Sequence, residues 1–425
     1  MRATLMRTAL ACLLLFSLLN VAAAQQPILK QGDRLAIIGD SITEQKQYSK
    51  FMETYLLACH PELDIKCFQF GWGGERAPGF ASRMENDLIP WHPDVITTCY
   101  GMNDGSYRAY DDNIGKAYEK GMRDIIDRMK KEGVTVVVGS PGVVDSFTWA
   151  RDRADFDQVY NANLKQLGEI AKSLAEENNF SHADVFGEMH DSMVAAKGKL
   201  GEEYPVAGND GVHPSANGHL IMAYAFLKAL GVSGDIGTIT INIGGDPEAS
   251  AGHKIVEADK EGTVEIESTR YPFCFTGNDK DPNGTVSILP FTPFNEDLNR
   301  FTLKVNNLSA PEAEVTFGDQ TKTFTKEQLS TGINLAAEFL DNPFSQPFDN
   351  VMNQVARKQA FETSMIKSLV TNFRQFQGLS KEDPEIQSAM DVLRDKMFAV
   401  DDKAYAKAKD AVVPVRYTIK VQPKN

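Results

Sequence analysis

Cysteine and histidine are scarce in this sequence. Its 425 residues include five cysteines and seven histidines. So few cysteines exclude a small scaffold held together by disulfides. His182, His190, His213 and His219 fall within one region, but their spacing matches no standard metal-ligand motif. We therefore expect no metal and no cofactor.

Positive charge is also in short supply. The chain carries 44 Lys and Arg residues against 58 Asp and Glu, which gives a formal net charge of −14 at pH 7. Such an acidic surface does not attract nucleic acids or anionic membranes. After the amino-terminal segment no apolar stretch is long enough to span a bilayer. We expect no nucleic-acid partner and no membrane span in the mature protein, and the sequence carries no signal for its oligomeric state.

The amino terminus has the features of a secretory signal peptide. Arg2 and Arg7 precede an apolar stretch over residues 9–21, and three alanines follow at 22–24. This order of a basic, an apolar and a small-residue segment is typical of signal peptides. The pattern predicts a signal peptide over residues 1–24, cleaved after Ala24, and a secreted or periplasmic protein.

Strand-like and helix-like segments alternate in the first half of the chain. Short apolar runs predict strands at Arg34–Ile38, Asp64–Phe70, Asp94–Cys99, Val134–Gly139 and Ala183–Phe186. Apolar residues at helical spacing predict helices at about 48–59, 112–130 and 157–177, and a last helix capped by Ser215 and stopped by Gly231. This alternation predicts an α/β fold with a flavodoxin-like, doubly wound, parallel five-stranded sheet.

Four short fragments of this region carry the residues of a hydrolytic site. They are Gly39-Asp40-Ser41, Gly73-Gly74, Gly101-Met102-Asn103-Asp104 and Asp210-Gly211-Val212-His213. A serine hydroxyl becomes a nucleophile when an imidazole takes its proton, and the imidazole needs a carboxylate to hold its tautomer. Ser41, His213 and Asp210 can fill these three roles.

Attack on an ester carbonyl also creates an oxyanion, which needs donors that already point at it. The candidates are the backbone N–H groups of Ser41 and Gly74 and the side-chain amide of Asn103. Gly74 suits this place because the absence of a side chain lets its N–H approach a ligand closely. Ser41 follows the first predicted strand and Asn103 the third, so both should reach the edge where open α/β sheets place their sites.

At these four fragments the chain resembles the SGNH hydrolases, also called GDSL esterases and lipases. The resemblance covers roughly residues 32–231, with all four fragments in the family's order. It implies that Ser41 is the nucleophile, that Gly74 and Asn103 are oxyanion donors, and that Asp210 and His213 complete the triad. Ile42 replaces the leucine of the family's name, which keeps an apolar residue after the nucleophile.

Each fragment alone also has a purely structural explanation. Gly-Asp-Ser is a common turn sequence, Asn103 could cap a helix, and residues 210–214 could be only a turn before one. The common α/β-hydrolase elbow, Gly-x-Ser-x-Gly, does not surround Ser41. Because all four fragments occur in the expected order, we favour catalysis over a non-catalytic protein on the same scaffold.

The pattern changes after residue 234. β-rich runs at 238–243, 263–268, 301–305 and 314–317 predict a small β-rich module, with Phe273, Phe275, Phe291 and Phe294 in its core. A helical insertion is predicted at about 325–410: Thr325 and Gln328 form a capping box, Leu329, Ile333, Ala337 and Leu340 mark one helix face, Phe348 to Val355 begin another helix, and Pro384 opens a third. A final strand at 412–421 should return to the β-rich module. The expected division is 25–234 for the hydrolase domain and 235–425 for this second part.

The substrate is harder to predict than the reaction. Relatives with these motifs include carbohydrate deacetylases, lysophospholipases, thioesterases and arylesterases. Export and an acidic surface favour a carbohydrate ester with a short acyl group, expected to be acetyl, over a lipid ester. Trp72 and Trp149 could stack on a sugar ring, or could be structural.

Overall fold

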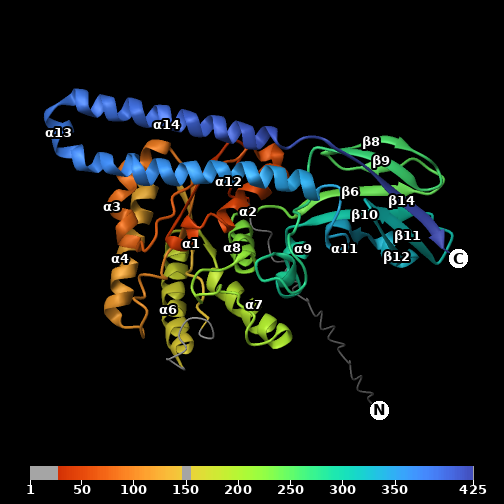
Figure 1. Ribbon diagram of the computed structural model, residues 1–425, viewed down its shortest axis with the longest axis horizontal. Helices are drawn as coiled ribbons and strands as arrows, with labels where there is room; N and C mark the ends of the chain where they lie inside the picture. Colours follow the sequence, from red (N-terminus) through yellow and green to blue (C-terminus); the bar gives the residue numbers. More distant parts are fainter. Residues whose placement is uncertain (1–26, 146–154, 425) are drawn as a thin grey trace, which may run out of the picture.

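The computed structural model of the protein describes residues 27–145 and 155–424 (Figure 1). The predicted signal peptide and Trp149 lie outside the described residues, so these two predictions stay predictions.

The N-terminal part of the chain, residues 27–234, is built on one parallel sheet. Its strands are β1 (Arg34–Gly39), β2 (Lys66–Gln69), β3 (Val95–Cys99), β4 (Thr135–Gly139) and β5 (Ser181–Ala183), in the order β2-β1-β3-β4-β5. Every neighbouring pair is parallel. β3, in the middle, is buried along its whole length, as expected for a strand covered on both faces. The predicted doubly wound, five-stranded fold is confirmed.

Helices cover both faces of this sheet. They are α1 (Ser41–Glu44), α2 (Tyr48–Ala58), α3 (Ala77–Asp87), α4 (Asp112–Glu132), α6 (Phe156–Glu177), α7 (Val185–Leu200) and α8 (Ala216–Ala229), with short 3-10 turns η1 (Pro61–Leu63) and η2 (Ile89–Trp91). Two separate apolar cores result: one holds Ile37 with residues of α2 and α8, the other holds Ile38 with residues of α3 and α4. Adjacent residues of β1 therefore point to opposite cores.

One local prediction in this part was wrong, and another was confirmed only in part. The fifth strand does not reach Phe186, because Asp184 accepts a hydrogen bond from the backbone N–H of Gly187 (2.9 Å) and starts α7. Ser215 occupies the N-cap position of α8 but makes no capping hydrogen bond with its side chain.

The C-terminal part, residues 235–424, contains two further sheets. One has the order β13-β10-β6-β7 and the other β12-β11-β14-β9-β8. The strands are β6 (Asp235–Asn242), β7 (Glu248–Ala249), β8 (His253–Ala258), β9 (Thr263–Ser268), β10 (Arg300–Asn306), β11 (Glu312–Phe317), β12 (Gln320–Thr325), β13 (Ile333–Asn334) and β14 (Val415–Lys424). β14 lies between β9 and β11, so the last strand returns to the β-rich module as predicted. Phe273, Phe275 and Phe294 are buried, and Phe291 packs against the same core. Contrary to the prediction, this core is not separate but is the one that holds Ile37, because Phe273 packs on Phe51 of α2 and Phe294 on Tyr224 of α8.

The helices of the C-terminal part are interleaved with these strands. They are η3 (Val286–Phe291), α9 (Phe294–Asp297), α10 (Lys326–Thr331), α11 (Leu335–Glu338), α12 (Ser345–Ser368), η4 (Val370–Phe376), α13 (Gln377–Glu382) and α14 (Pro384–Asp410). The capping box of Thr325 and Gln328 is confirmed. The prediction of one helix face from Leu329 to Leu340 is wrong. α10 ends before Gly332, because the φ of +116° at Gly332 is incompatible with a helix, and the strand β13 follows.

The two long helices α12 and α14 lie side by side and reach back over the N-terminal part (Figure 1). α12 packs on α2 and along β2, the edge strand of the parallel sheet. Lys358 donates to the backbone carbonyl of Cys67 (2.7 Å), and Glu362 accepts from the backbone N–H of Gln69 (3.0 Å). Side chains of α12 thus satisfy backbone groups that an edge strand otherwise leaves open.

The described residues contain four cysteines and no disulfide. Cys59, Cys67, Cys99 and Cys274 are all buried free thiols. Cys59, at the end of α2, and Cys67, in β2, are therefore not bridged to one another. In the same part of the chain no helix combines the length and apolar character needed to cross a membrane.

Candidate active site

β1 delivers Ser41 to the carboxyl edge of the sheet. Gly39 ends the strand in a place too tight for a side chain, since an added Cβ would lie 2.1 Å from Thr43 Oγ1 and 2.8 Å from the Cys99 carbonyl. Asp40 then caps α1 by accepting from the Ile42 N–H (2.9 Å). Burial, together with the charges of Asp104 and Glu75, raises the pKa of Asp40 to about 7.

Ser41 is joined to the Asp210–His213 turn through the imidazole. His213 Nε2 lies 2.8 Å from Ser41 Oγ, and His213 Nδ1 lies 2.6 Å from Asp210 Oδ2. The carboxylate places the ring proton on Nδ1, so Nε2 is the acceptor for the serine hydroxyl. The structure therefore brings these three residues together in the order that serine activation requires.

The Asp210 carboxylate is held by its own turn. Its Oδ1 accepts from the backbone N–H groups of Val212 (2.9 Å) and His213 (2.8 Å), which leaves Oδ2 for the imidazole. Partial burial acts to raise the pKa of Asp210, but these hydrogen bonds and the contact with His213 lower it. Asp210 is thus ionised wherever His213 can act as a base.

The loop over residues 71–75 contacts the nucleophile's strand and helix. The Trp72 N–H donates to the Gly39 carbonyl (3.0 Å), and Gly73 N–H donates to Glu44 Oε2 (2.5 Å). Gly74 has a φ of +71°, a conformation that favours glycine, and apart from its chain neighbours no residue has an atom within 4 Å of where its Cβ would be. Gly74 therefore has open space beside it, whereas the Gly73 N–H is already bonded to Glu44.

Asn103 lies in the loop after β3 and contacts the same segment. Its Nδ2 donates to the Glu75 carbonyl (3.1 Å), and its Oδ1 accepts from the Tyr107 hydroxyl (3.2 Å). These two bonds fix the orientation of the amide, and its NH₂ group has a second hydrogen. The loops that carry Gly74 and Asn103 are therefore tied together.

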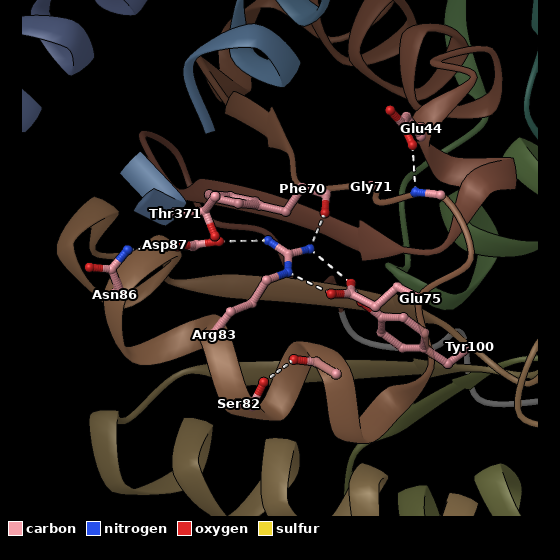
Figure 2. Close-up of polar contacts among 12 residues, drawn as sticks. Glu44, Phe70, Gly71, Glu75, Ser82, Arg83, Asn86, Asp87, Tyr100 and Thr371 are labelled. Carbon is pink, nitrogen blue, oxygen red and sulfur yellow. Dashed lines mark hydrogen bonds and ion pairs between the residues drawn. The ribbon is translucent and has the colours of Figure 1, made fainter. Parts of the chain in front are cut away.

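A buried arginine anchors this loop, and the sequence analysis did not find it (Figure 2). Arg83 of α3 binds both oxygens of Glu75 (2.6 and 2.8 Å), Asp87 (3.0 Å) and the Phe70 carbonyl (2.7 Å). Burial acts to lower the pKa of Arg83, but Glu75 holds it above its ordinary value. A usable signal was the inward face of α3, where Arg83 and Asp87 occur at the same helical spacing as Phe80 and Met84.

Asp104 is a second buried carboxylate that sequence reasoning left without a role. It accepts from the backbone N–H groups of Gly101 and Ala77, both at 3.0 Å. Ala77 is the first residue of α3, so Asp104 caps that helix from the neighbouring loop. Burial raises the pKa of Asp104 to about 6.

Trp72 is partly buried and its ring is contacted by two cations. Arg83 Cζ lies 5.0 Å and Lys367 Nζ 4.8 Å from the ring centroid. Lys367 belongs to α12 and also pairs with Glu44 (2.6 Å), the acceptor of Gly73. A sugar stacking on Trp72 would have to share the ring with these cations, so this role stays a prediction.

Comparison with known proteins finds similarity over the N-terminal part of the chain. Residues 37–221 match the GDSL-like lipase/acylhydrolase family. An acetylxylan esterase from Geobacillus stearothermophilus is 28% identical over 223 residues, which are 47% of this chain and 94% of that protein.

One solved structure resembles nearly the whole chain. It is a gut microbial diltiazem-metabolizing enzyme, with a TM-score of 0.70 and 23% identity over 93% of this chain and 98% of its own. At this identity the likeness concerns the fold, and it extends to the C-terminal part. The family match and the acetylxylan esterase relative lead to one identification: the segment over residues 37–221 belongs to the GDSL-like lipase/acylhydrolase family, the SGNH hydrolases, and the protein is a carboxylic ester hydrolase.

Proposed function

We propose that the protein is an exported serine esterase that removes short acyl groups, acetyl above all, from carbohydrate through an acyl-Ser41 intermediate. The observation that carries this proposal is the imidazole of His213, which lies within hydrogen-bond distance of both Ser41 Oγ (2.8 Å) and Asp210 Oδ2 (2.6 Å). A serine, a histidine and a carboxylate in this order are the requirements of acyl transfer.

In the first half-reaction, Ser41 Oγ attacks the ester carbonyl carbon while His213 Nε2 takes the hydroxyl proton. The tetrahedral intermediate then collapses: the bond to the alcohol oxygen breaks, and His213 returns the proton to that oxygen. In the second half-reaction, water attacks the acyl carbon, gives its proton to His213, and Ser41 leaves with that proton. Asp210 stabilises the imidazolium in both halves.

The oxyanion of both intermediates is assigned to the backbone N–H groups of Ser41 and Gly74 and to Asn103 Nδ2. Each such donor contributes roughly 10²–10³ in rate. The open space beside Gly74 and the fixed orientation of the Asn103 amide support this assignment.

The substrate class rests on one relative and on the composition. The acetylxylan esterase relative is aligned over 94% of its own length, which supports acetyl groups on carbohydrate. The net charge of −14 fits a neutral glycan better than an anionic lipid surface. Export rests on the predicted signal peptide, and the mature protein should begin at Gln25.

The first experiment measures hydrolysis of p-nitrophenyl acetate, butyrate and octanoate by the mature protein and by Ser41→Ala. Turnover that falls with chain length and disappears in Ser41→Ala supports the proposal. A preference for octanoate would indicate a lipid acylhydrolase instead. A fluorophosphonate should add one covalent adduct to the wild type and none to Ser41→Ala, as intact mass would record.

A further inference from the structure

A polar hollow of about 410 Å³ lies against Asp210 and His213. Four carboxamides and a hydroxyl line its other sides: Gln45, Gln47, Asn209, Asn283 and Ser215. Among the described residues that line it there is no lysine, arginine, phenylalanine, tyrosine or tryptophan. Its walls are therefore uncharged apart from the proposed catalytic pair, and nearly all their polar groups can both donate and accept hydrogen bonds.

The position of the hollow decides which half of an ester it can receive. When the acyl-enzyme forms, the leaving alcohol oxygen takes its proton from His213 Nε2, so the alcohol lies on the histidine side of Ser41. Of the oxyanion donors assigned above, Gly74 and Asn103 lie on other loops, after β2 and β3. A hollow bounded by His213 and Asp210 is thus on the alcohol side of the ester.

Gln45 is oriented by a buried histidine beneath it. His219 of α8 is fully buried, and burial, with the nearby charges of Lys50 and His213, lowers its pKa to about 3, so the ring is neutral. Its Nδ1 accepts from the Tyr48 N–H (3.3 Å), which places the ring proton on Nε2, and Nε2 donates to Gln45 Oε1 (2.8 Å). With the oxygen held by His219, the NH₂ group of Gln45 is left as the donor for the hollow.

Asn283 comes from the C-terminal part, in the loop between β9 and η3. The Asn283 N–H donates to Asp281 Oδ1 (2.9 Å), and Ser287 donates to the Asp281 carbonyl (2.8 Å). The Pro282 carbonyl accepts from the backbone N–H of Asn217 at the start of α8 (3.5 Å). The loop is therefore tied both to itself and to the helix that follows His213.

We propose that this hollow is the subsite for the alcohol part of the ester, that this alcohol is an uncharged polyhydroxylated compound such as a sugar, and that Gln45 and Asn283 hold it. This inference rests on the proposed function, because it takes Ser41 and His213 as the reacting pair. Carboxamides match the adjacent hydroxyls of a sugar, whereas an alkyl chain finds few apolar surfaces in the hollow. The C-terminal part then contributes directly to substrate selection.

The test compares two acetate esters with unactivated alcohols, a mono-O-acetylated methyl glycoside and butyl acetate. Asn283→Ala should raise KM for the glycoside about 3–10-fold, the effect of losing one hydrogen bond, and leave butyl acetate hydrolysis unchanged. Lys280→Ala, at an exposed position of the same loop that does not line the hollow, is the control and should change neither.

A second variant addresses Gln45 without breaking its bond to His219. Gln45→Glu keeps an acceptor for His219 Nε2 and replaces the outward NH₂ by an oxygen, so KM for the glycoside should rise more than KM for butyl acetate. Equal effects on the two esters, no effect of Asn283→Ala, or a wild type that prefers butyl acetate would each overturn the proposal.

Failure of the proposed function itself has a different signature. In that case the wild type hydrolyses neither ester, and fluorophosphonate does not label Ser41. If Ser41-dependent hydrolysis is present but the two esters respond alike to Asn283→Ala, the esterase assignment stands and only the subsite is wrong.

Discussion

The two sides of the candidate site are built in opposite ways. On the nucleophile side, Asp40, Arg83 and Asp104 are 2%, 2% and 7% exposed and hold the loops through charges buried in the protein. On the histidine side, the Asp210 side chain is 51% exposed and is fixed by two N–H groups of its own turn. The first side depends on residues distant in sequence, and the second is a local structure.

The difference in burial predicts that substitutions on the two sides affect different quantities, stability on one side and rate on the other. A buried charge with its partner removed is strongly destabilising, whereas an exposed carboxylate can be changed with little effect on folding. Substitutions of the buried charges on the nucleophile side should therefore act mainly through folding, and substitutions in the Asp210 turn should act mainly through rate.

The largest expected effect is that of Asp210→Asn. The asparagine oxygen should still accept the hydrogen bonds from the N–H groups of Val212 and His213. Its NH₂ group then faces His213 Nδ1 and donates to it, so the ring proton moves to Nε2. Nε2 then cannot accept from Ser41, and kcat for p-nitrophenyl acetate should fall by roughly 10⁴. The melting temperature should change little. Asp191→Asn, an exposed aspartate of α7, is the control; an Asp210→Asn enzyme within tenfold of wild type would remove Asp210 from the mechanism.

Arg83→Met tests the nucleophile side. It leaves Glu75 and Asp87 without their cation in a buried place, and the free energy of unfolding should fall by about 3–5 kcal/mol. Arg123→Met removes an arginine whose side chain is 42% exposed and paired with Glu119 and Glu177, and should cost about 1 kcal/mol or less. Urea denaturation measures both; similar losses would mean that burial does not set the difference.

The two sides should also respond to pH with opposite signs. Asp40 has its pKa raised from 3.8 to about 7 in the folded protein, so the folded state binds an extra proton between these values. The stability of the wild type relative to Asp40→Asn should therefore fall by about 3 kcal/mol as the pH rises from 4 to 7.

Asp210 has a lowered pKa, so it stabilises the folded state above its unfolded value of 3.8, and this contribution is lost as the pH falls through the folded value. Chemical denaturation between pH 3 and pH 8 measures both differences. If the difference in free energy of unfolding between the wild type and Asp40→Asn stays constant from pH 4 to pH 7, the raised pKa of Asp40 is contradicted.

The smallest expected effect is that of replacing Lys367, which links the C-terminal part to the nucleophile side. Its contact with Glu44 is partly exposed, so Lys367→Met should lower kcat by about fivefold or less through the Gly73–Gly74 loop and leave KM unchanged. Lys367→Arg should restore the rate, and the exposed Lys396→Met is the control. A change in KM alone would assign Lys367 to substrate binding instead.

Sequence patterns predicted the parts of the fold that depend on local periodicity. The alternation of apolar runs with helical faces was sufficient for the parallel sheet, and Thr325 with Gln328 was sufficient for a helix start. The same reasoning failed where a single residue ended an element early, as Asp184 does after β5 and Gly332 does after α10. Local propensity competes there with capping and backbone conformation, which a run of apolar residues does not reveal.

The candidate site divides in the same way. Ser41, Gly74, Asn103, Asp210 and His213 were predicted from short motifs, because each motif carries its chemistry within a few residues. Lys367 and Asn283 were not predicted, because their partners lie on other elements. Arg83 was missed although Asp87 lies on the same helix, because its other partner, Glu75, lies outside α3. Nothing in the spacing of Asn283 and His213 indicates that they line one hollow.

The sequence by itself determined the succession of strands and helices along the first half of the chain, the turn that joins Asp210 to His213, and the residue types needed for ester hydrolysis. These features follow from periodicity and from hydrogen bonds between near neighbours. Only the tertiary structure decided that α12 covers the edge strand β2 and that a loop after β9 reaches the side of His213. Such contacts join residues from 70 to 293 positions apart, and they depend on burial and packing that no local pattern encodes.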